Sequence, residues 1–366
     1  MQPEHHRHRN SSLPTHPWRP TNLVLRLPVG PVPFKDVDDE TDVVTVLPLR
    51  ASEDQTHLVS PLPRKTLYGA LELRCYQGFW LPESWVPAAM ALQRRFEPRP
   101  DDVIVASLPK CGTTWLVSLL FSTMARRAHP PGAADHPLRR LNAHQCAPML
   151  EGVFSGGRER KLDELPSPRL MYTHMPLAMI PWAAPADGAG GCRVVYICRE
   201  PKDMVVSLLH FFGHVFPGMT LHGVFESACD GGMICGPFWD HIAGYRRASE
   251  SRPGNVLFLR YEELLRDPAE NVRRVARFVG MPFSPAEEED GVVRGIVELC
   301  SLNSLKGMEA NKTGYVDPLV RIPREALFRK GVAGDWANHL TPEMAHRMDE
   351  IVADKFGAMG LNFHGI

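Results

Sequence analysis

Four segments of this chain repeat one pattern, and the repetition constrains the fold more than any other feature. In each segment a short apolar run ends at a polar residue, and a helical pattern usually follows. The four runs are DDVIVAS, PRLMYTH, RVVYICRE and NVLFLRY. Continuous β-branched runs of this length are typical of strands buried on both faces, and alternation with helices indicates a parallel sheet. The sequence therefore predicts an α/β fold, a single domain with a central parallel β-sheet flanked by helices.

Proline and glycine positions agree with this alternation. Pro201 and Pro268 stand where the first turn of a helix tolerates proline, and Gly280 is placed to end a helix. Residues 88–96 have helical spacing, and MPLAMIP after PRLMYTH is expected to continue as a helix. We expect the domain to extend over residues 70–366.

Residues 1–65 differ in composition from the rest of the chain. They are rich in proline and contain only short apolar pieces, so we expect a flexible N-terminal extension. The opening stretch, MQPEHHRHRNSSLPTHPWRP, is compatible with a disordered tail, an inaccurate start site or a transit peptide. We interpret its histidines as a solvated tail rather than a metal site.

The composition excludes several kinds of partner. Lys and Arg (41) nearly balance Asp and Glu (42), so bulk charge favours neither nucleic acid nor an anionic membrane. No apolar run reaches membrane-spanning length. The eight cysteines form no CxxC pair, which argues against a zinc cluster and fits reduced thiols. We therefore expect a cytoplasmic protein with no metal, no nucleic-acid partner and no membrane partner.

Four polar side chains are predicted to converge at one edge of the sheet. In open α/β sheets, ligands bind beyond the carboxyl ends of the strands. The residues that fall there are Lys110, His174, Arg199 and Tyr261. Three of them carry or can carry positive charge, so this edge is expected to bind an anionic ligand.

The loop SLPKCGTTWL resembles a phosphate-binding loop but reverses its order. A nucleoside triphosphate loop reads G-x-x-x-x-G-K-[ST], whereas here Lys110 precedes Gly112. Gly112 permits close approach of the backbone, and the following helix directs free N–H groups at an anion. Thr113 and Thr114 add hydroxyl donors. Trp115 is either a core residue or an aromatic platform for a purine, and the sequence leaves both open.

Two further segments provide candidates for a second phosphate group. Arg199 ends one apolar run, and Ser207 lies eight residues later in the predicted helix. A fork of guanidinium donors and a hydroxyl can hold one phosphate from two sides. Arg329, Lys330 and Gly331 place two cations beside a flexible backbone, and they are candidates to cover the same anion.

His174 is the candidate general base. It follows a predicted strand and precedes Pro176, and imidazole is the side chain best suited to removing a proton near neutral pH. A histidine in general is more often structural than catalytic, so this assignment depends on the predicted position at the sheet edge.

Together, these motifs resemble one family closely: the cytosolic (soluble) sulfotransferases, and within it the plant branch. The resemblance extends in order from YQGFW near residue 76 to the C-terminus. That family transfers a sulfonate group from 3′-phosphoadenosine 5′-phosphosulfate (PAPS) to a hydroxyl of a small molecule and releases 3′,5′-bisphosphoadenosine (PAP). SLPKCGTTWL is similar to its P-loop-like phosphosulfate-binding loop, YICREPKDMVVS to the segment that binds the 3′-phosphate, and RKGVAGDW to the loop that closes over it.

The resemblance implies roles for individual residues. His174 would be the general base, and Lys110 would stabilise charge on the leaving phosphate. Thr113 and Thr114 would hold the 5′-phosphate, and Trp115 would stack on adenine. The implied donor-binding residues are Lys110, Cys111, Gly112, Thr113, Thr114, Trp115, Arg199, Ser207, Tyr261, Ser301, Arg329, Lys330 and Gly331.

The chain departs from the family pattern in several places. Cys111 replaces the commoner serine of the loop, either as a neutral substitute or as a redox-sensitive thiol. Tyr172 stands where animal members carry a lysine, and Leu302 stands where an aromatic residue usually faces adenine. Cys300 falls where a threonine often contacts the donor, which makes Ser301 the expected hydroxyl there.

The implied partner is a small hydrophobic acceptor with a hydroxyl group, such as a flavonoid, a steroid or a jasmonate-type compound. The dimer motif of animal members is degenerate here, with Ala337, Pro342 and His346 at three of its positions, so we expect a monomer or a weak homodimer.

Two other functions are less compatible with this sequence. A kinase-like phosphotransferase is disfavoured because the loop lacks glycine before lysine and no acidic Mg²⁺ site stands out. A nucleotide-binding protein without catalysis would be expected to have lost the base, yet His174 is present.

Overall fold

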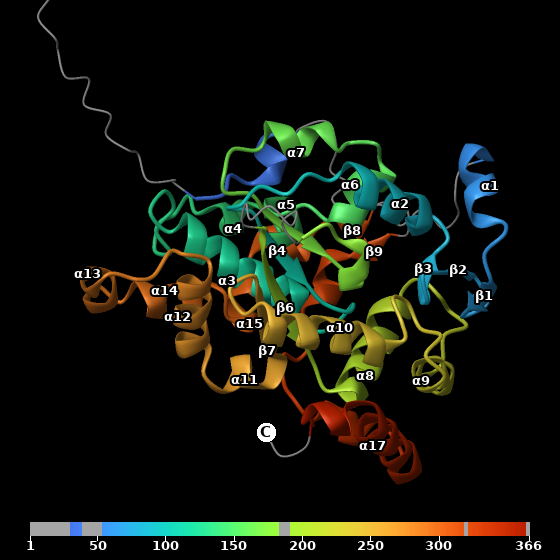
Figure 1. Ribbon diagram of the computed structural model, residues 1–366. Coiled ribbons are helices and arrows are strands. Elements are labelled where there is room, and N and C mark those ends of the chain that lie inside the picture. The colour runs from blue at the N-terminus through green and yellow to red at the C-terminus, as the bar shows by residue number, and fades with distance from the viewer. Residues whose placement is uncertain (1–29, 39–52, 183–190, 318–320, 364–366) are drawn as a thin grey trace, which may run out of the picture.

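A four-stranded parallel sheet lies at the centre of the molecule (Figure 1). The computed structural model describes residues 30–38, 53–182, 191–317 and 321–363. The strand order is β5-β4-β6-β7, and every residue of β4 and β5 is buried. The strands are β4 (Val103–Ala106), β5 (Leu170–Thr173), β6 (Arg193–Cys198) and β7 (Val256–Arg260). The predicted α/β fold with a central parallel sheet is confirmed.

The register of the sheet brings the ends of its strands together. Ala106 at the end of β4 pairs with Thr173 of β5 on one side and with Tyr196 of β6 on the other. The residues that follow these strands therefore emerge at one edge, where the sequence places Lys110, His174 and Arg199.

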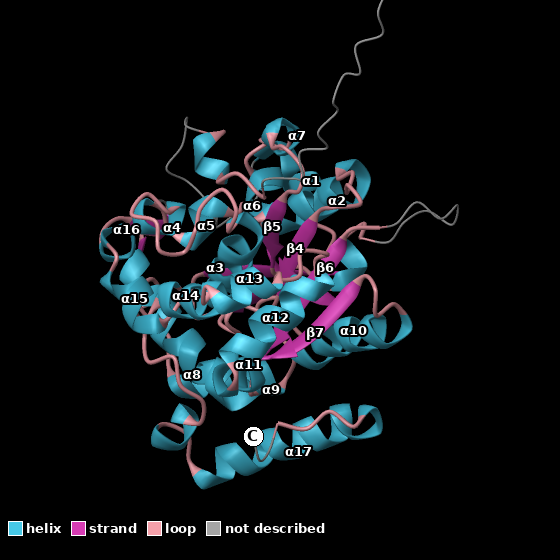
Figure 2. Ribbon diagram, turned by 90° about the vertical axis from the view of Figure 1, so that its left-hand side faces the viewer, coloured by secondary structure: helices cyan, strands magenta, loops and turns pink. Residues whose placement is uncertain are grey.

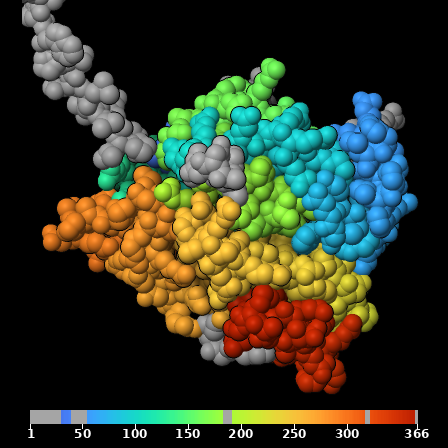
Figure 3. All heavy atoms as spheres, viewed as in Figure 1, coloured from blue at the N-terminus to red at the C-terminus, as the bar shows by residue number. Residues whose placement is uncertain are grey.

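Helices lie on both sides of the sheet (Figure 2). On one side α3 packs against β4 and β5, and α12 and α14 pack against α3, whereas α10 packs against β7. On the face shown in Figure 3, α17 forms a red ridge, and it packs against α8, α9 and α10. The helices are α1 (Thr56–Val59), α2 (Trp85–Arg95), α3 (Thr113–Ala125), α4 (Pro137–Arg140), α5 (Ala143–Cys146), α6 (Leu150–Ser155), α7 (Arg160–Glu164), α8 (Pro201–Phe212), α9 (Leu221–Cys229), α10 (Phe238–Ser251), α11 (Tyr261–Arg266), α12 (Pro268–Phe278), α13 (Pro285–Glu289), α14 (Val292–Leu299), α15 (Leu302–Gly307), α16 (Glu309–Lys312) and α17 (Pro342–Phe356).

The expected helix boundaries are found with one exception. Pro201 and Pro268 are the first residues of α8 and α12, and Gly280 adopts a left-handed φ of 74° just after α12. The segment MPLAMIP, expected to be helical, forms only a single 3₁₀ turn, Leu177–Met179. Ile180 is extended there because it precedes a proline, whose ring disfavours the helical conformation of the residue before it.

Two small antiparallel sheets were not predicted. The first is formed by β1 (Arg64–Leu67), β2 (Leu71–Tyr76) and β3 (Phe79–Pro82) in sequential order. The second pairs β8 (Tyr315–Asp317) with β9 (Ile322–Pro323). Both contribute residues to the cavity described below.

Part of the expected N-terminal extension packs on the domain. Within residues 30–38, the side chain of Phe34 is buried in the core, Asp36 forms an ion pair with Arg140, and Asp38 pairs with Arg158. The proline-rich composition did not predict this packing. The expectation of flexibility for residues 1–29 and 39–52 lies outside the described residues.

Among the described helices, none is both long enough and apolar enough to cross a membrane.

Candidate active site

A cavity of about 220 Å³ opens at the carboxyl end of the central sheet. Its walls come from the segments after β4, β5, β6 and β7 and from residues near 302–331. Most of the residues predicted from the sequence line it together: Lys110, Gly112, Thr113, Thr114, Trp115, His174, Arg199, Ser207, Tyr261, Arg329, Lys330 and Gly331.

The loop between β4 and α3 has the geometry of an anion site. Gly112 caps α3 with a left-handed φ of 107° and no side-chain cap, so the N–H groups of the first turn have no intrahelical partner. A Cβ at this position would lie 2.7 Å from Cδ2 of Tyr261. Lys110 is also left-handed, with a φ of 69°. The Thr113 hydroxyl lies 2.6 Å from the Ser107 hydroxyl, which fixes the start of the helix.

Two predicted donor-binding residues do not line the cavity. Cys111 is fully buried in the core, and burial raises the pKa of its thiol to about 12. At neutral pH the group is therefore a neutral thiol, without the thiolate that oxidation requires. Ser301 caps α15, and its hydroxyl accepts a hydrogen bond from the N–H of Ser304 at 3.2 Å.

The cations of the cavity have few acidic partners inside it. Within the described residues, none of the side chains that line the cavity is acidic. Burial, together with Arg199 and Arg329 nearby, lowers the pKa of Lys110 to about 7. The Lys110 ammonium lies 3.9 Å from the ring centroid of Phe211, and no carboxylate within the described residues forms an ion pair with it. An anion bound beside this ammonium would restore its charge.

Arg199 is held mainly by carbonyl groups. Its guanidinium donates to the carbonyl of Lys110 at 3.4 Å and to that of Val332 at 3.0 Å, and it lies 3.7 Å from Asp203. Its Nε atom is buried and has no hydrogen-bond partner in the described part of the chain. An unsatisfied buried donor of this kind fits a ligand that brings an acceptor oxygen.

Residues 328–336 form a closing segment over this end of the cavity. Arg329 and Lys330 both donate to Asp335, at 2.5 and 2.6 Å. Burial alone would raise the pKa of Asp335, but these two hydrogen bonds hold it well below its usual range. The carboxylate of Asp203 accepts the backbone N–H groups of Gly334 and Trp336, which ties the segment to α8.

His174 has a defined tautomer. Its Nδ1 atom lies 2.8 Å from the carbonyl oxygen of Ser107. A carbonyl only accepts, so Nδ1 carries the proton and Nε2 keeps a lone pair. Burial, with a further contribution from Lys110, lowers the pKa of the ring to about 4. His174 is therefore a neutral imidazole at neutral pH, able to accept a proton.

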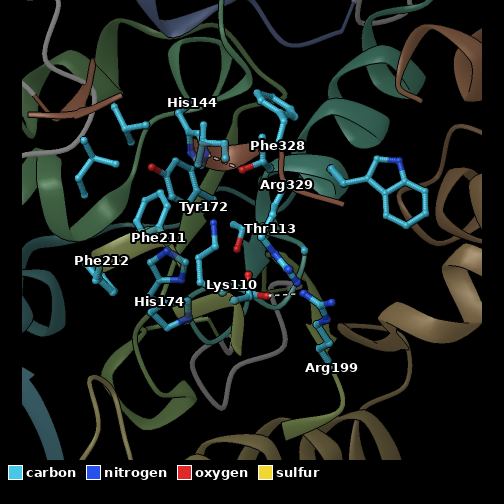
Figure 4. A pocket seen from close by; sticks show the side chains of 18 of the residues that line it. Lys110, Thr113, His144, Tyr172, His174, Arg199, Phe211, Phe212, Phe328 and Arg329 are labelled. Carbon is cyan, nitrogen blue, oxygen red and sulfur yellow. Dashed lines mark hydrogen bonds between the residues drawn. The ribbon is translucent and has the colours of Figure 1, made fainter. Parts of the chain in front are cut away.

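The cavity has two chemically different ends. In Figure 4, Lys110 lies between the histidine side of the cavity, with His174, and the side that carries Arg199 and Arg329. Much of the remaining wall is apolar, and Phe211 and Phe212 lie on the side of His174 in Figure 4. The other apolar lining residues include Leu71, Pro82, Trp85, Met149, Val215, Phe216, Ile234, Val316, Ile322 and Phe328.

Three polar residues near the site were missed by sequence reasoning. His144 lines the cavity, and its Nε2 lies 2.9 Å from the Thr114 hydroxyl. Glu151 and His241 are buried behind His174. Two signals could have found them: Glu151 interrupts the apolar run APMLEGVF, and His241 falls on the same helical face as Phe238 and Ile242.

Comparisons with known proteins agree with this geometry. The sulfotransferase domain family matches residues 100–360. Cytosolic sulfotransferase 8 of Arabidopsis thaliana is 40% identical over 315 residues, which are 85% of this chain and 93% of the relative. Cytosolic sulfotransferase 5 of the same plant is 38% identical over 320 residues, 85% of this chain and 97% of the relative.

Solved structures give the same result. A candidate steroid sulphotransferase of Arabidopsis thaliana matches with a TM-score of 0.68 and 33% identity, covering 87% of this chain and 100% of that chain. Mouse sulfotransferase SULT7A1 complexed with PAP matches with a TM-score of 0.59 and 25% identity, covering 78% and 94%.

The fold and the family match define a sulfotransferase, an enzyme that transfers a sulfonate group to a hydroxyl acceptor with PAPS, the general donor of the family. The chain belongs to the plant cytosolic sulfotransferases.

Proposed function

We propose that this enzyme sulfonates a hydrophobic hydroxylated small molecule, with His174 as general base and Lys110 stabilising the leaving phosphate. The observation that carries the proposal is the hydrogen bond from His174 Nδ1 to the Ser107 carbonyl. It leaves a neutral Nε2 available in a cavity that Lys110 also lines.

The donor fits the residues at the cationic end of the cavity. The open first turn of α3, with Thr113 and Thr114, would hold the 5′-phosphosulfate. Trp115 and Tyr261, whose ring centroids lie 5.7 Å apart, would flank the adenosine part. When bound, the donor supplies the sulfonate group. The residues that would hold the 3′-phosphate are Arg199, Ser207, Arg329, Lys330 and Gly331.

The geometry of Gly331 concerns the surface that would face adenine. It has a left-handed φ of 65°, and a Cβ there would lie 2.8 Å from Cδ2 of Leu302. The backbone of the closing segment therefore packs tightly over Leu302, in the position where the family usually has an aromatic residue. We infer that Trp115 provides the aromatic surface for adenine, with Leu302 as an aliphatic surface nearby.

The chain's own groups would do two things during transfer. His174 Nε2 would accept the proton of the acceptor hydroxyl, and its Nδ1–H would stay on the Ser107 carbonyl. Lys110, which forms no ion pair with a carboxylate of the described residues, would place its charge where negative charge develops on the leaving group. The cavity would hold the reacting groups in line, so positioning contributes together with charge.

Two substitutions test these roles. His174→Ala is expected to reduce turnover to a small residual rate while PAP binding, measured by calorimetry, stays within about threefold of the unchanged protein. Lys110→Ala is expected to slow sulfonate transfer by a factor of about 100 or more. The exposed His346 of α17 offers a control, because His346→Ala should alter neither quantity. Lost PAP binding in His174→Ala would contradict a base role, and near-normal rates in Lys110→Ala would contradict the role of that lysine.

The apolar end of the cavity supports an uncharged acceptor. Around His174 the walls offer aromatic side chains such as Phe211 and Phe212, and Arg199 and Arg329 lie on the other side of Lys110 in Figure 4. Flavonoids and steroids fit these walls better than a jasmonate-type acid, whose carboxylate would be desolvated against apolar side chains. One solved relative is itself described as a candidate steroid sulphotransferase.

An acceptor panel with labelled PAPS tests this preference. A flavonoid, a steroid and a jasmonate-type hydroxy acid would be compared, and the methyl ester of the acid would serve as its matched uncharged control. We expect the ester to have the higher kcat/KM. A higher kcat/KM for the free acid would show that the acceptor end recognises a carboxylate.

A further inference from the structure

The peptide groups around His174 are held from several sides. The backbone N–H of His174 donates to Oε1 of Glu151 at 2.6 Å. Its carbonyl oxygen accepts from Nε2 of His241 at 3.1 Å. The ring is fixed separately through Nδ1 and the Ser107 carbonyl. The orientation of this residue is thus determined by three hydrogen bonds to three different parts of the chain.

Glu151, in α6, has both carboxylate oxygens occupied. Oε2 accepts from the Thr173 hydroxyl at 2.8 Å, and that hydroxyl in turn accepts from the N–H of Met175 at 3.0 Å. Because the Thr173 oxygen receives this N–H, its own hydrogen is directed at Glu151. The carboxylate therefore binds donors from consecutive residues at the end of β5.

His241, in α10, has equally defined proton positions. Its Nε2 faces the carbonyl of His174, so this nitrogen carries the hydrogen. Its Nδ1 then accepts from the Tyr196 hydroxyl at 3.0 Å. Next to it, the Tyr245 hydroxyl donates to the carbonyl of Met175 at 2.8 Å. The N–H and carbonyl groups of His174 and Met175 are therefore satisfied by side chains rather than by a neighbouring strand.

A buried carboxylate is an energetically unfavourable partner for the N–H of His174 and the hydroxyl of Thr173. Glu151 is 0% exposed, and no arginine or lysine forms an ion pair with it within the described residues. Burying an unpaired charge costs several kcal/mol unless hydrogen bonds compensate, and burial raises the pKa of Glu151 to about 7. A group with this cost at the backbone of a candidate base indicates a role beyond packing.

We propose that Glu151 and His241 are positioning residues for sulfonate transfer, which act through His174 by fixing its backbone so that Nε2 faces the acceptor hydroxyl. The proposal rests on the role of His174 as general base given above. A small misplacement of a catalytic group can cost about two orders of magnitude in rate.

A double-mutant cycle separates positioning from mere stabilisation. Glu151→Ala is expected to lower kcat by about 10- to 100-fold, with PAP affinity and the KM for PAPS within about threefold of the unchanged enzyme. In the His174→Ala background, the same substitution is expected to lower the residual rate less than about twofold, because the group it positions is gone. Glu151→Gln keeps an acceptor oxygen for the His174 N–H and is expected to restore most of kcat.

His241→Phe gives a second cycle if Glu151→Ala does not fold. It keeps a ring of similar size but removes the donor to the His174 carbonyl. We expect it to lower kcat in the unchanged enzyme but to have little effect in the His174→Ala background. Asp102→Asn is the matched control. Asp102 is also fully buried, pairs with Arg169 and lies at the opposite, amino end of β4. This variant should lower the melting temperature without changing kcat of the folded protein.

The outcomes are distinguishable. An unchanged kcat in Glu151→Ala and His241→Phe, or equal losses in the presence and absence of His174, would overturn the positioning role while leaving the base role intact. Near-normal turnover in His174→Ala would overturn the base role and the positioning role together.

Discussion

Raising the pH above 7 is expected to weaken the binding of PAP, with a slope that approaches about tenfold per pH unit, because Lys110 loses its proton in the empty site. Burial and the neighbouring guanidinium groups lower the pKa of Lys110 to about 7. A bound phosphate would raise that pKa again, so binding is strongest below the pKa of the free protein and is lost as the pH rises above it. Binding at pH 9 should be about 50-fold weaker than at pH 7.

Titration calorimetry between pH 7 and pH 9 measures this effect directly. PAP is used because it binds without turnover, and its phosphate groups, with a second pKa near 6, change their ionisation by only about a tenth over this range. At pH 8, about 0.9 proton should be taken up for each PAP bound. This uptake is measured by repeating the titration in buffers with different ionisation enthalpies, because the observed binding heat then changes from buffer to buffer.

Lys110→Arg is the matched variant, because arginine keeps its charge throughout the range. Its affinity for PAP should be almost independent of pH, and no proton should be taken up. If the unchanged protein shows a flat affinity from pH 7 to pH 9, or if Lys110→Arg shows the same slope, the lowered pKa of Lys110 does not govern donor binding.

Three further substitutions probe the loop and its surroundings. Gly112→Ala should weaken PAP binding at least tenfold in calorimetry. An alanine in the left-handed conformation is strained by about 1 kcal/mol or more, and its Cβ would collide with the Tyr261 ring. Unchanged affinity would contradict this tight fit. Cys111→Ser should leave kcat within about threefold. Cys111 in the unchanged enzyme should resist alkylation, since its buried thiol is protonated, and rapid labelling of Cys111 found by peptide mapping would contradict this. His144→Phe should weaken PAP binding about fivefold by removing the partner of the Thr114 hydroxyl, and no change would show that this hydrogen bond does not support the donor site.

The sheet and its edge could be predicted because their signals are local. Each buried strand is a continuous apolar run, and the residue that follows it emerges at a known edge. Lys110, His174 and Arg199 were assigned to the site on this basis, and they line one cavity. The proline positions at the starts of α8 and α12 are local signals of the same kind.

The missed features depend on contacts between distant parts of the chain. Glu151 meets His174 across 23 residues, and His241 meets it across 67, so no local pattern reports either contact. Ser301 shows a second contribution that the motif did not predict. Its place in the motif assigns its hydroxyl to the donor, and the structure shows that this hydroxyl also caps α15, as a serine before a helix often does.

The two ends of the cavity are built from different parts of the chain. The anion-binding loop and Arg199 follow buried strands that are paired on both sides. Much of the apolar wall comes from the end of α8 and from the β8–β9 pair, which lie outside the central sheet. After gene duplication, copies of such a chain are free to diverge in the wall while the donor end stays constant. The architecture thus favours the growth of a set of enzymes that share one donor and differ in the molecules they modify.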